Sequence, residues 1–358
     1  MYRTFSLTLM VNHACNLRCS YCYTGAKIQR PMPPRIARAA VDRAVASLEP
    51  GGLFELGFFG GEPLVEARLV ASIKSYAQEL SSSRGLRFSC SLTTNGTIAE
   101  SDAWALLLDP AVAVSISHDG LPSTHDRYRV SIDGRGTSDA VGRTLRRMVS
   151  AGREFNVVLV VRPDTVSTLV EGIQYLREMG VRRVEPSLDL WTPWSLVDRE
   201  RLYQSVAECA DLWRQALPAF SISWFDEKLA RLARVPLDQG ARCAFGDGQI
   251  AVAPSGNLFP CERLIGEDAP GHPWRLPGHA LEGSPFLNLR PSASVDAASC
   301  SDCPGKDSCG ATCRCSNVVR TGSPGAPDDL LCTFDRVCTE ELVRVIGIPV
   351  MEAEEFDG

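Results

Sequence analysis

The sequence predicts an α/β fold, a partial (β/α)6 barrel of the TIM type followed by a smaller cysteine-rich domain. Strand-like and helix-like segments alternate six times within the first 190 residues, and consecutive β/α units form a parallel sheet with helices outside. Nine of the 14 cysteines then lie between Cys243 and Cys338. We therefore expect a catalytic domain over residues 1–235, a second domain over 236–345 and an acidic tail over 346–358.

Six short apolar runs supply the strands of this sheet. They cover residues 5–11, 53–59, 86–92, 113–116, 156–161 and 181–187. Helices are expected where apolar residues recur every three or four positions. These stripes lie at 36–48, 65–80, 141–149 and 169–179. Residues 191–240 are expected to be helical and bridging, and residues 250–260 to form a hairpin around a tight turn.

Composition limits the classes of protein to which the chain can belong. Its 358 residues are enough for about two domains. A net charge of −6 without a long basic block disfavours a nucleic-acid substrate. No apolar run reaches the ~20 residues of a membrane span, and the start is not a cleavable signal. We expect a cytoplasmic protein without membrane contact, in which so many cysteines bind metal.

Cys15, Cys19 and Cys22 are the first candidate metal ligands. Three thiolates at this spacing can hold three corners of an iron–sulfur cube, and no fourth cysteine stands nearby. An iron with an open position does chemistry, whereas a fully ligated cluster mostly passes electrons. A zinc knuckle would need four ligands, and His13 has the wrong spacing. A disulfide scaffold does not suit a long chain without a signal peptide.

Other polar motifs follow the next predicted strands. Gly60-Gly61-Glu62-Pro63 comes after the second strand, Asn95 after the third and Ser117 after the fourth. The carboxyl ends of parallel strands share one rim of a barrel. The sequence therefore predicts that these motifs and the three cysteines meet at that rim.

With the cysteine trio and the Gly-Gly-Glu-Pro loop in place, the chain resembles the radical S-adenosylmethionine (SAM) superfamily. The resemblance makes residues 1–235 a radical SAM core. It implies that Cys15, Cys19 and Cys22 bind a [4Fe-4S] cluster whose open iron chelates the amino and carboxylate groups of SAM. One electron then releases a 5′-deoxyadenosyl radical, which removes a hydrogen atom from the substrate.

The same resemblance implies which residues contact SAM. Tyr21 would lie near the adenine, and the loop of Gly60, Gly61 and Glu62 would bind the methionine amino group. Ser117 and Arg129 match a serine and an arginine that contact SAM in related maturases, and an arginine can take a carboxylate with two hydrogen bonds. A surface position explains Arg129 otherwise. Asn95 is a further candidate SAM contact, for which a plain turn residue is an equally good explanation.

The second domain resembles the SPASM extension of radical SAM enzymes, which holds two auxiliary [4Fe-4S] clusters. The resemblance rests on seven spaced cysteines between residues 243 and 332. By the family pattern, the inner cluster is bound by Cys243, Cys261 and Cys313. The outer cluster is bound by Cys300, Cys303, Cys309 and Cys332. The expected cofactors are thus SAM and three [4Fe-4S] clusters, one catalytic and two auxiliary.

Four other cysteines are not among the seven of this pattern. The sulfatase-maturing branch has one more cysteine soon after the first SPASM cysteine, and residues 244–249 contain none. A fourth protein ligand of the inner cluster is therefore left open, with Cys315 as the nearest spare thiol. Cys338 is an alternative to Cys332, while Cys90 and Cys209 are expected to be buried packing thiols.

Glu262 is the candidate catalytic residue, because it directly follows Cys261. In sulfatase-maturing enzymes an aspartate at the matching place is thought to take a proton from the substrate, and a glutamate with a raised pKa could do the same. A surface glutamate is an equally good explanation of this position.

The leading functional prediction is a maturase that oxidises or crosslinks a residue of a ribosomally made peptide. Sulfatase maturation to formylglycine, peptide epimerisation and oxidation of a small molecule such as a sugar are the alternatives. An electron carrier without radical chemistry would not need the Gly-Gly-Glu loop. Expected partners are a precursor peptide and a one-electron reductant such as ferredoxin or flavodoxin. Because little chain precedes Cys15, a leader peptide would be bound by the catalytic domain or by a separate leader-binding protein.

Overall fold

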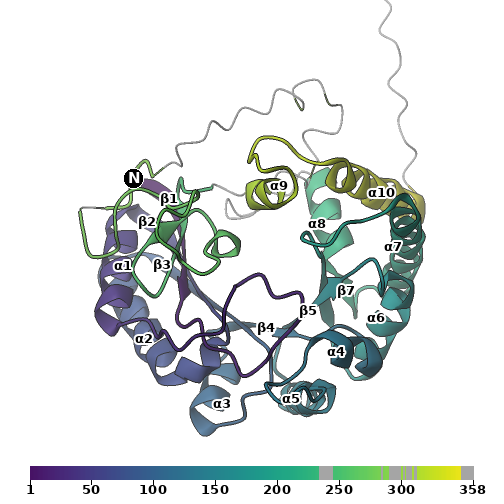
Figure 1. The fold of residues 1–358 in the computed structure, drawn as a ribbon, viewed down its shortest axis with the longest axis horizontal. Coiled ribbons are helices and arrows are strands. Elements are labelled where there is room, and N and C mark those ends of the chain that lie inside the picture. Colours follow the sequence, from purple (N-terminus) through teal and green to yellow (C-terminus); the bar gives the residue numbers. More distant parts are fainter. Residues whose placement is uncertain are drawn as a thin grey trace, which may run out of the picture.

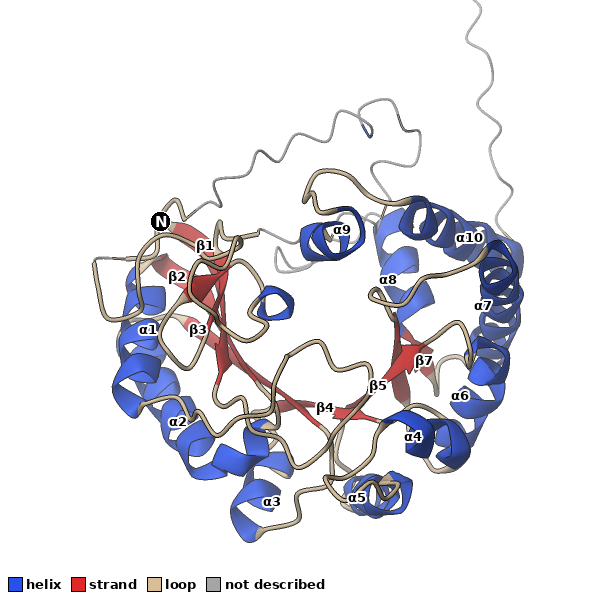
Figure 2. Ribbon diagram, viewed as in Figure 1, coloured by secondary structure: helices blue, strands red, loops and turns tan. Residues whose placement is uncertain are grey.

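A curved, mainly parallel sheet forms the centre of the molecule, and helices cover its outer side (Figures 1 and 2). The computed structural model describes residues 1–233, 245–283, 285–289 and 313–347, together with Cys300, Cys303 and Cys309. Cys243 and residues 348–358 of the predicted tail lie outside the described residues. The edges of the sheet do not close on each other, which confirms the predicted partial barrel.

The described strands belong to one sheet. They are β1 (Tyr2–Met10), β2 (Leu48–Phe59), β3 (Arg87–Thr94), β4 (Ala113–Ser117), β5 (Asn156–Val161), β6 (Arg183–Leu188), β7 (Ser221–Ile222), β8 (Gln249–Val252) and β9 (Leu258–Phe259). Their order is β7-β6-β5-β4-β3-β2-β1-β8-β9, and only the β8–β9 pair is antiparallel. All six predicted strands are present in chain order, so the predicted run of β/α units is confirmed.

Helices follow the strands along the outside of the sheet. They are α1 (Pro34–Ala46), α2 (Ala67–Ser83), α3 (Ser101–Leu107), α4 (Pro122–Tyr128), α5 (Ser138–Ser150), α6 (Leu169–Glu178), α7 (Leu196–Ala216), α8 (Ser223–Leu232), α9 (Arg314–Thr321) and α10 (Asp329–Ile346). The sequence does not predict α3 and α4, because seven residues span less than two turns of apolar periodicity. Within the described residues, no helix combines the length and the apolar character that crossing a bilayer requires.

The side chains of β1 show how the sheet separates its core from the interior of the barrel. Phe5, Leu7 and Leu9 are at most 1% exposed and pack in the hydrophobic core, which also contains the apolar faces of α1 and α2. Ser6 lies on the opposite face, where its hydroxyl donates to the Glu55 carboxylate of β2. Because successive side chains of a strand point to opposite faces, the apolar residues face the helices and the polar ones face inward.

Part of the second predicted domain completes the same sheet. β8 pairs with β1, with Ile250 opposite Leu7, and the predicted hairpin is present as β8 and β9. At the far end, α10 lies against α7 and α8 (Figure 1). Lys228 of α8 and Asp335 of α10 form a buried ion pair of 2.6 Å. The short helix α9 lies at the open side of the barrel (Figure 1).

Candidate functional site

One cavity at the carboxyl ends of the strands collects the motifs that the sequence singles out. It has a volume of about 190 Å³. The predicted cluster ligands and SAM contacts all line it, namely Cys15, Cys19, Cys22, Tyr21, Gly60, Gly61, Glu62, Asn95, Ser117 and Arg129. They come from the loops after β1 and β2, the ends of β3 and β4, and the residue after α4. The fold thus brings together side chains that are up to 114 positions apart (129 − 15).

The three cysteines lie among donors that suit thiolates. The backbone N–H of Leu17 donates to Cys15 Sγ at 3.3 Å, and the Asn95 amide donates to the same sulfur at 3.7 Å. Lys27 Nζ lies 3.1 Å from Cys22 Sγ. Hydrogen bonds to cluster sulfurs are among the features that set cluster potentials. Asn95 is therefore more than a turn residue, because its amide supports a candidate ligand.

Burial disfavours the charged thiolate form of these cysteines when no metal is bound. It raises the pKa of Cys15 to about 11, and it also raises the pKa of Cys19. Burial also acts to raise the pKa of Cys22, but the Lys27 ammonium and the hydrogen bonds of Thr24 and Lys27 together outweigh it, and the pKa lies below its ordinary value. A bound metal stabilises thiolates at such positions, because only the deprotonated sulfur is a ligand.

The arrangement of the three cysteines is compatible with an iron–sulfur cluster. Each thiolate of such a cluster binds a different iron. Three cysteines around one cavity, with N–H donors at two of the sulfurs, therefore fit the predicted [4Fe-4S] cluster.

Gly60 and Gly61 let two loops meet backbone to backbone. A Cβ on Gly61 would lie 2.2 Å from the Ala14 carbonyl oxygen, and one on Gly60 would lie 2.6 Å from the Asn12 carbonyl oxygen. The N–H of Gly61 donates to the Asn12 carbonyl at 2.8 Å, and that of Glu62 donates to the Ala14 carbonyl at 2.9 Å. The glycines thus fix the start of the cysteine loop against the loop after β2, in addition to any approach to a ligand.

The Glu62 carboxylate joins the ends of β2 and β3. It is 1% exposed and accepts from the N–H of Leu64 at 2.9 Å, the Thr94 hydroxyl at 2.8 Å and the N–H of Asn95 at 2.7 Å. Burial raises its pKa to about 7, against the effect of these three donors. Glu62 therefore shapes the rim of the cavity as well as lining it.

Arg129 is a buried residue, which removes the surface explanation of this position. Its side chain is 9% exposed, and Nε donates to Asp119 Oδ2 at 3.0 Å. The same carboxylate accepts from the Tyr21 hydroxyl and from the N–H of Val160. Because the ion pair uses Nε, the two terminal nitrogens of Arg129 can donate to an anionic group in the cavity.

An aromatic stack separates this cavity from a second one. The ring of Tyr23 lies 4.7 Å from that of Trp191 at an interplanar angle of 2°, and 6.2 Å from that of Phe59. Tyr23 and Phe59 line both cavities. The second cavity has a volume of about 580 Å³, and Glu262 lines it without lining the first. Glu262 thus lines the second cavity next to Cys261, whose thiol lies 3.4 Å from the Glu262 carboxylate.

The cysteines of the second domain form two neighbourhoods. Cys313 Sγ lies 3.3 Å from Cys315 Sγ, and Cys315 also hydrogen-bonds Cys261. Cys261 and Cys313 are predicted inner ligands, and Cys313 lines the second cavity. In the other neighbourhood, burial raises the pKa of Cys332, and the nearby thiols of Cys300 and Cys303 add to this shift. Those three belong to the predicted outer set.

Three other described cysteines lie in the hydrophobic core, whereas Cys309 is half-buried outside it. Cys90 is 4% exposed, Cys209 is fully buried and Cys338 is 3% exposed. All three belong to the main core cluster. This placement agrees with packing thiols at Cys90 and Cys209. It also favours Cys332 over Cys338 in the outer set, because Cys332 is the one near Cys300 and Cys303.

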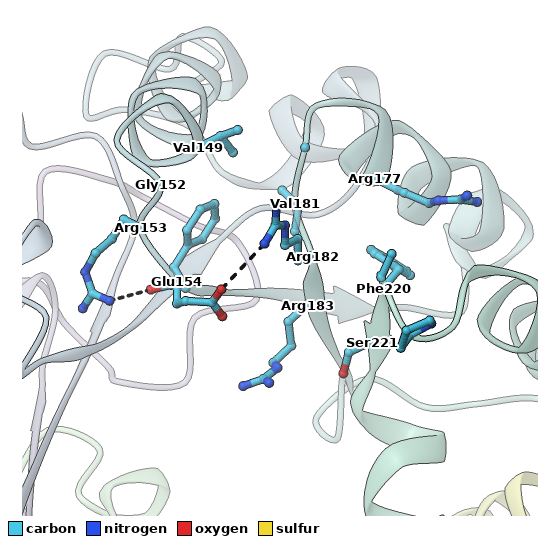
Figure 3. Close-up of a pocket in the computed structure, with 14 residues that line it drawn as sticks. Val149, Gly152, Arg153, Glu154, Arg177, Val181, Arg182, Arg183, Phe220 and Ser221 are labelled. Carbon is cyan, nitrogen blue, oxygen red and sulfur yellow. Dashed lines mark hydrogen bonds and ion pairs between the residues drawn. The ribbon is translucent and has the colours of Figure 1, made fainter.

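A further cavity lies at the opposite ends of the strands (Figure 3). Its volume is about 760 Å³, and Phe155, Arg183 and Ser221, at the amino ends of β5, β6 and β7, line it. Arg182 points toward Glu154 across this cavity at 3.9 Å. It does not contain any of the predicted site residues, so it is separate from the candidate site.

A match to a known family identifies the first part of this protein. Residues 9–176 match the model of the radical SAM superfamily. The enzyme contains a radical SAM domain. The matched segment contains the cysteine trio, the Gly-Gly-Glu loop and Arg129, which are the features gathered around the first cavity.

Curated relatives and solved structures are similar to this chain. The enzyme is 24% identical over 294 residues to a cysteine-type anaerobic sulfatase-maturating enzyme of Clostridium perfringens strain 13, covering 75% of this chain and 76% of that protein. It is 28% identical over 187 residues to an uncharacterised protein of Methanocaldococcus jannaschii, where the match spans 52% of this chain and 63% of the relative. Its fold matches that of anSMEcpe with bound AdoMet at a TM-score of 0.78 and 20% identity, covering 96% and 98% of the two chains.

A peptide-bound structure has the same fold. Streptococcus suis SuiB bound to the precursor peptide SuiA matches this radical SAM enzyme at a TM-score of 0.62 and 15% identity, with 92% of this chain and 76% of that chain covered. The anSMEcpe structures include one with bound AdoMet and a Kp18Cys peptide. Both of these solved structures thus share the fold of this chain and contain a bound peptide.

Sequence reasoning missed several residues that shape the site. The Asp119 carboxylate accepts hydrogen bonds from Arg129 and Tyr21, and Lys27 donates one to Cys22. Trp191 completes the aromatic stack, and Arg263 lines both cavities. Asp119 comes two residues after the end of β4, as active residues of barrels follow strand ends, and that position could have marked it. Lys27 is only five positions from Cys22, whereas Trp191 and Arg263 depend on contacts between distant segments.

Proposed function

We propose that this radical SAM enzyme is a maturase that modifies a residue of a peptide or protein. The observation that carries the proposal is the arrangement of its two cavities. The cavity with the cysteine trio adjoins the larger one, because Tyr23, Phe59 and Arg263 line both. The larger cavity reaches Cys313 of the second domain. A substrate in it would lie between the radical source and the auxiliary cysteines.

The residues of the first cavity have distinct tasks toward SAM. When bound to the cluster of Cys15, Cys19 and Cys22, SAM supplies a 5′-deoxyadenosyl radical that removes a hydrogen atom from the substrate. Arg129 would bind the SAM carboxylate with its terminal nitrogens, while Asp119 holds its Nε. The loop of Gly61 and Glu62 would face the amino group. The stack of Tyr23 and Trp191 would keep water from the reacting atoms.

After the hydrogen atom has been removed, oxidation of the substrate radical releases one electron, and the second domain would accept that electron. We propose that residues 236–345 hold two auxiliary [4Fe-4S] clusters, so that the enzyme carries three in all, and that an external one-electron reductant serves the catalytic one. The neighbourhoods of Cys261 with Cys313, and of Cys332 with Cys300, support this division. Glu262 lines the substrate cavity and could accept the proton that an oxidised residue loses.

Sulfatase maturation is the second candidate function. The similarity to the Clostridium perfringens enzyme over 75% of this chain favours it. The absence of a cysteine in residues 244–249 favours a different peptide substrate. The two functions differ in their substrate, since a sulfatase maturase acts on a sulfatase-derived peptide and a peptide maturase on a dedicated precursor.

Iron counting and SAM cleavage test the proposal together. Anaerobic reconstitution should give about twelve irons per chain, from three four-iron clusters. Replacing Cys15, Cys19 and Cys22 with alanine should abolish release of 5′-deoxyadenosine and leave about eight irons. Cys90→Ala, which removes a buried thiol outside the site, is the matched control and should keep both. About four irons in the parent enzyme, or deoxyadenosine from the triple variant, would contradict the proposal.

A substrate assay separates the two candidate functions. The reconstituted enzyme is incubated with a sulfatase-derived cysteine or serine peptide and, separately, with candidate precursor peptides, and the products are analysed by mass spectrometry. Formylglycine in the first arm would establish sulfatase maturation. Loss of two hydrogens from a precursor peptide without formylglycine would establish oxidative peptide modification.

A further inference from the structure

Cys315 lies in contact with both described candidate ligands of the inner auxiliary cluster. Its Sγ is 3.3 Å from that of Cys313, and it hydrogen-bonds Cys261. The three residues come from two parts of the chain, since Cys261 precedes a short 3₁₀ helix, Glu262–Leu264, whereas Cys313 and Cys315 lie at the start of α9. Cys261 and Cys313 are candidate ligands because the SPASM cysteine pattern of the sequence includes them, and that pattern does not include Cys315.

Burial distinguishes Cys315 from a surface thiol. It is 3% exposed and packs with Phe245, Leu264 and Val318 around Cys261. Every other fully buried cysteine outside the candidate sites, such as Cys209, lies in the main hydrophobic core among helices. Cys315 is instead in a separate small cluster whose members surround candidate iron ligands.

We propose that Cys315 is the fourth protein ligand of the inner auxiliary cluster, beside Cys243, Cys261 and Cys313. The thiol releases its proton to solvent, and its sulfur binds the iron that the three-cysteine pattern leaves without a protein ligand. The cluster then has no open iron, and it serves electron transfer rather than substrate binding. This inference rests on the proposed auxiliary clusters, and it goes beyond the family pattern on which they are based.

A partly buried cation suits the extra negative charge of a fourth thiolate. Nη1 of Arg263 donates to the Ser316 hydroxyl at 3.1 Å, and that hydroxyl lies 3.2 Å from Cys313 Sγ. Such a fixed cation next to several thiolates is one way in which a protein tunes a cluster with a second layer of contacts.

A spectroscopic experiment on the full chain tests the proposal. Cys15, Cys19 and Cys22 are replaced with alanine so that only auxiliary clusters remain, and Cys315→Ala, Cys315→Ser or Cys338→Ser is added. Cys338 is the matched control because it is also 3% exposed. Each protein is reconstituted, its iron is counted, and the reduced clusters are exposed to ¹³C-cyanide and examined by electron paramagnetic resonance for carbon hyperfine coupling.

The expected outcome separates Cys315 from Cys338. The parent and Cys338→Ser should hold about eight irons and show no ¹³C coupling. Cys315→Ala should gain coupling to cyanide at a newly open iron, or lose about four irons. Cys315→Ser should keep about eight irons with shifted g values, since an oxygen replaces one sulfur.

Other outcomes would overturn the inference in distinguishable ways. Coupling to cyanide already in the parent, or unchanged spectra of both Cys315 variants, would show that Cys315 is a packing thiol while leaving the auxiliary clusters in place. A parent without iron would instead overturn the auxiliary clusters themselves, and the inference with them.

Discussion

Replacing Gly61 with alanine is expected to destabilise the enzyme and to stop its chemistry. The new Cβ would lie 2.2 Å from the Ala14 carbonyl oxygen and 2.5 Å from that of His13. A Cβ does not approach a backbone oxygen closer than 3.0 Å, so the two loops must separate by about 0.8 Å or more (3.0 − 2.2). The cysteine loop, which begins at Cys15, would move with Ala14.

The size of the effect follows from the hydrogen bonds between these loops. Gly61 and Glu62 donate to the carbonyls of Asn12 and Ala14 at 2.8 and 2.9 Å. A typical hydrogen bond contributes about 1 kcal/mol, and a buried group left without a partner costs about 1–3 kcal/mol. We expect Gly61→Ala to lower the free energy of unfolding by about 2–4 kcal/mol. A displacement near 1 Å at a reacting centre can cost about 100-fold in rate.

Two measurements check this prediction against a control. Denaturant unfolding of the iron-free protein gives the stability change, and release of 5′-deoxyadenosine by the reconstituted enzyme gives the rate. Gly142→Ala is the control, because Gly142 lies inside α5 and its Cβ would meet nothing closer than 3.5 Å. It should be neutral or stabilising by up to about 1 kcal/mol. If Gly61→Ala behaved like Gly142→Ala in both assays, the reasoning about the loop contact would be refuted.

Three other predictions concern the buried polar residues behind the cavity. Arg129→Gln should raise the dissociation constant for SAM at least tenfold in equilibrium dialysis and leave the iron content unchanged, because one charged contact contributes about 1.5–3 kcal/mol; equal affinity would exclude a carboxylate contact. Asp119→Asn should lower the free energy of unfolding by about 3–5 kcal/mol, since it leaves the Arg129 charge unpaired. Burial lowers the pKa of His118 to about 4 and that of His125 to about 3. Below pH 6.5, the ordinary pKa of histidine, the unfolded chain therefore takes up protons at these two residues that the folded chain does not. The free energy of unfolding should fall by about 2 kcal/mol per histidine between pH 6.5 and 5. His118→Asn should make that fall shallower in denaturant titrations at both pH values.

The strands could be predicted because their apolar pattern is local. β5 occupies residues 156–161 in both the sequence prediction and the structure, since its run of valines and leucine is bounded by polar residues. β7 has two residues and β8 has four. Segments this short have no periodicity of their own, and the pairing of β8 with β1 depends on a contact across more than 240 positions (Ser6 to Gln249). No window of sequence contains that information.

The same contrast holds for the glycines of the site. The Gly-Gly-Glu-Pro run is conspicuous in the sequence, and it indicates a loop that something approaches closely. The sequence cannot say what approaches. The structure places the backbone of residues 12–14 against Gly60 and Gly61, so part of the requirement for glycine comes from the protein itself.

The candidate iron ligands lie close together along the chain, whereas some of the cations near them lie far away in the sequence. Cys15, Cys19 and Cys22 lie within eight residues, so their spacing alone indicates a cluster. One of the cations near them is local, because Lys27 acts on Cys22 from five positions away (27 − 22), but Arg129 acts on Cys19 from 110 positions away (129 − 19). At the proposed inner auxiliary site, Arg263 acts on Cys313 from 50 positions away (313 − 263). A short spacing motif can thus indicate where iron binds, whereas some of the charges around the sulfurs depend on the fold. Substitutions at Arg129 and Arg263 are therefore expected to change cluster properties without changing cluster number.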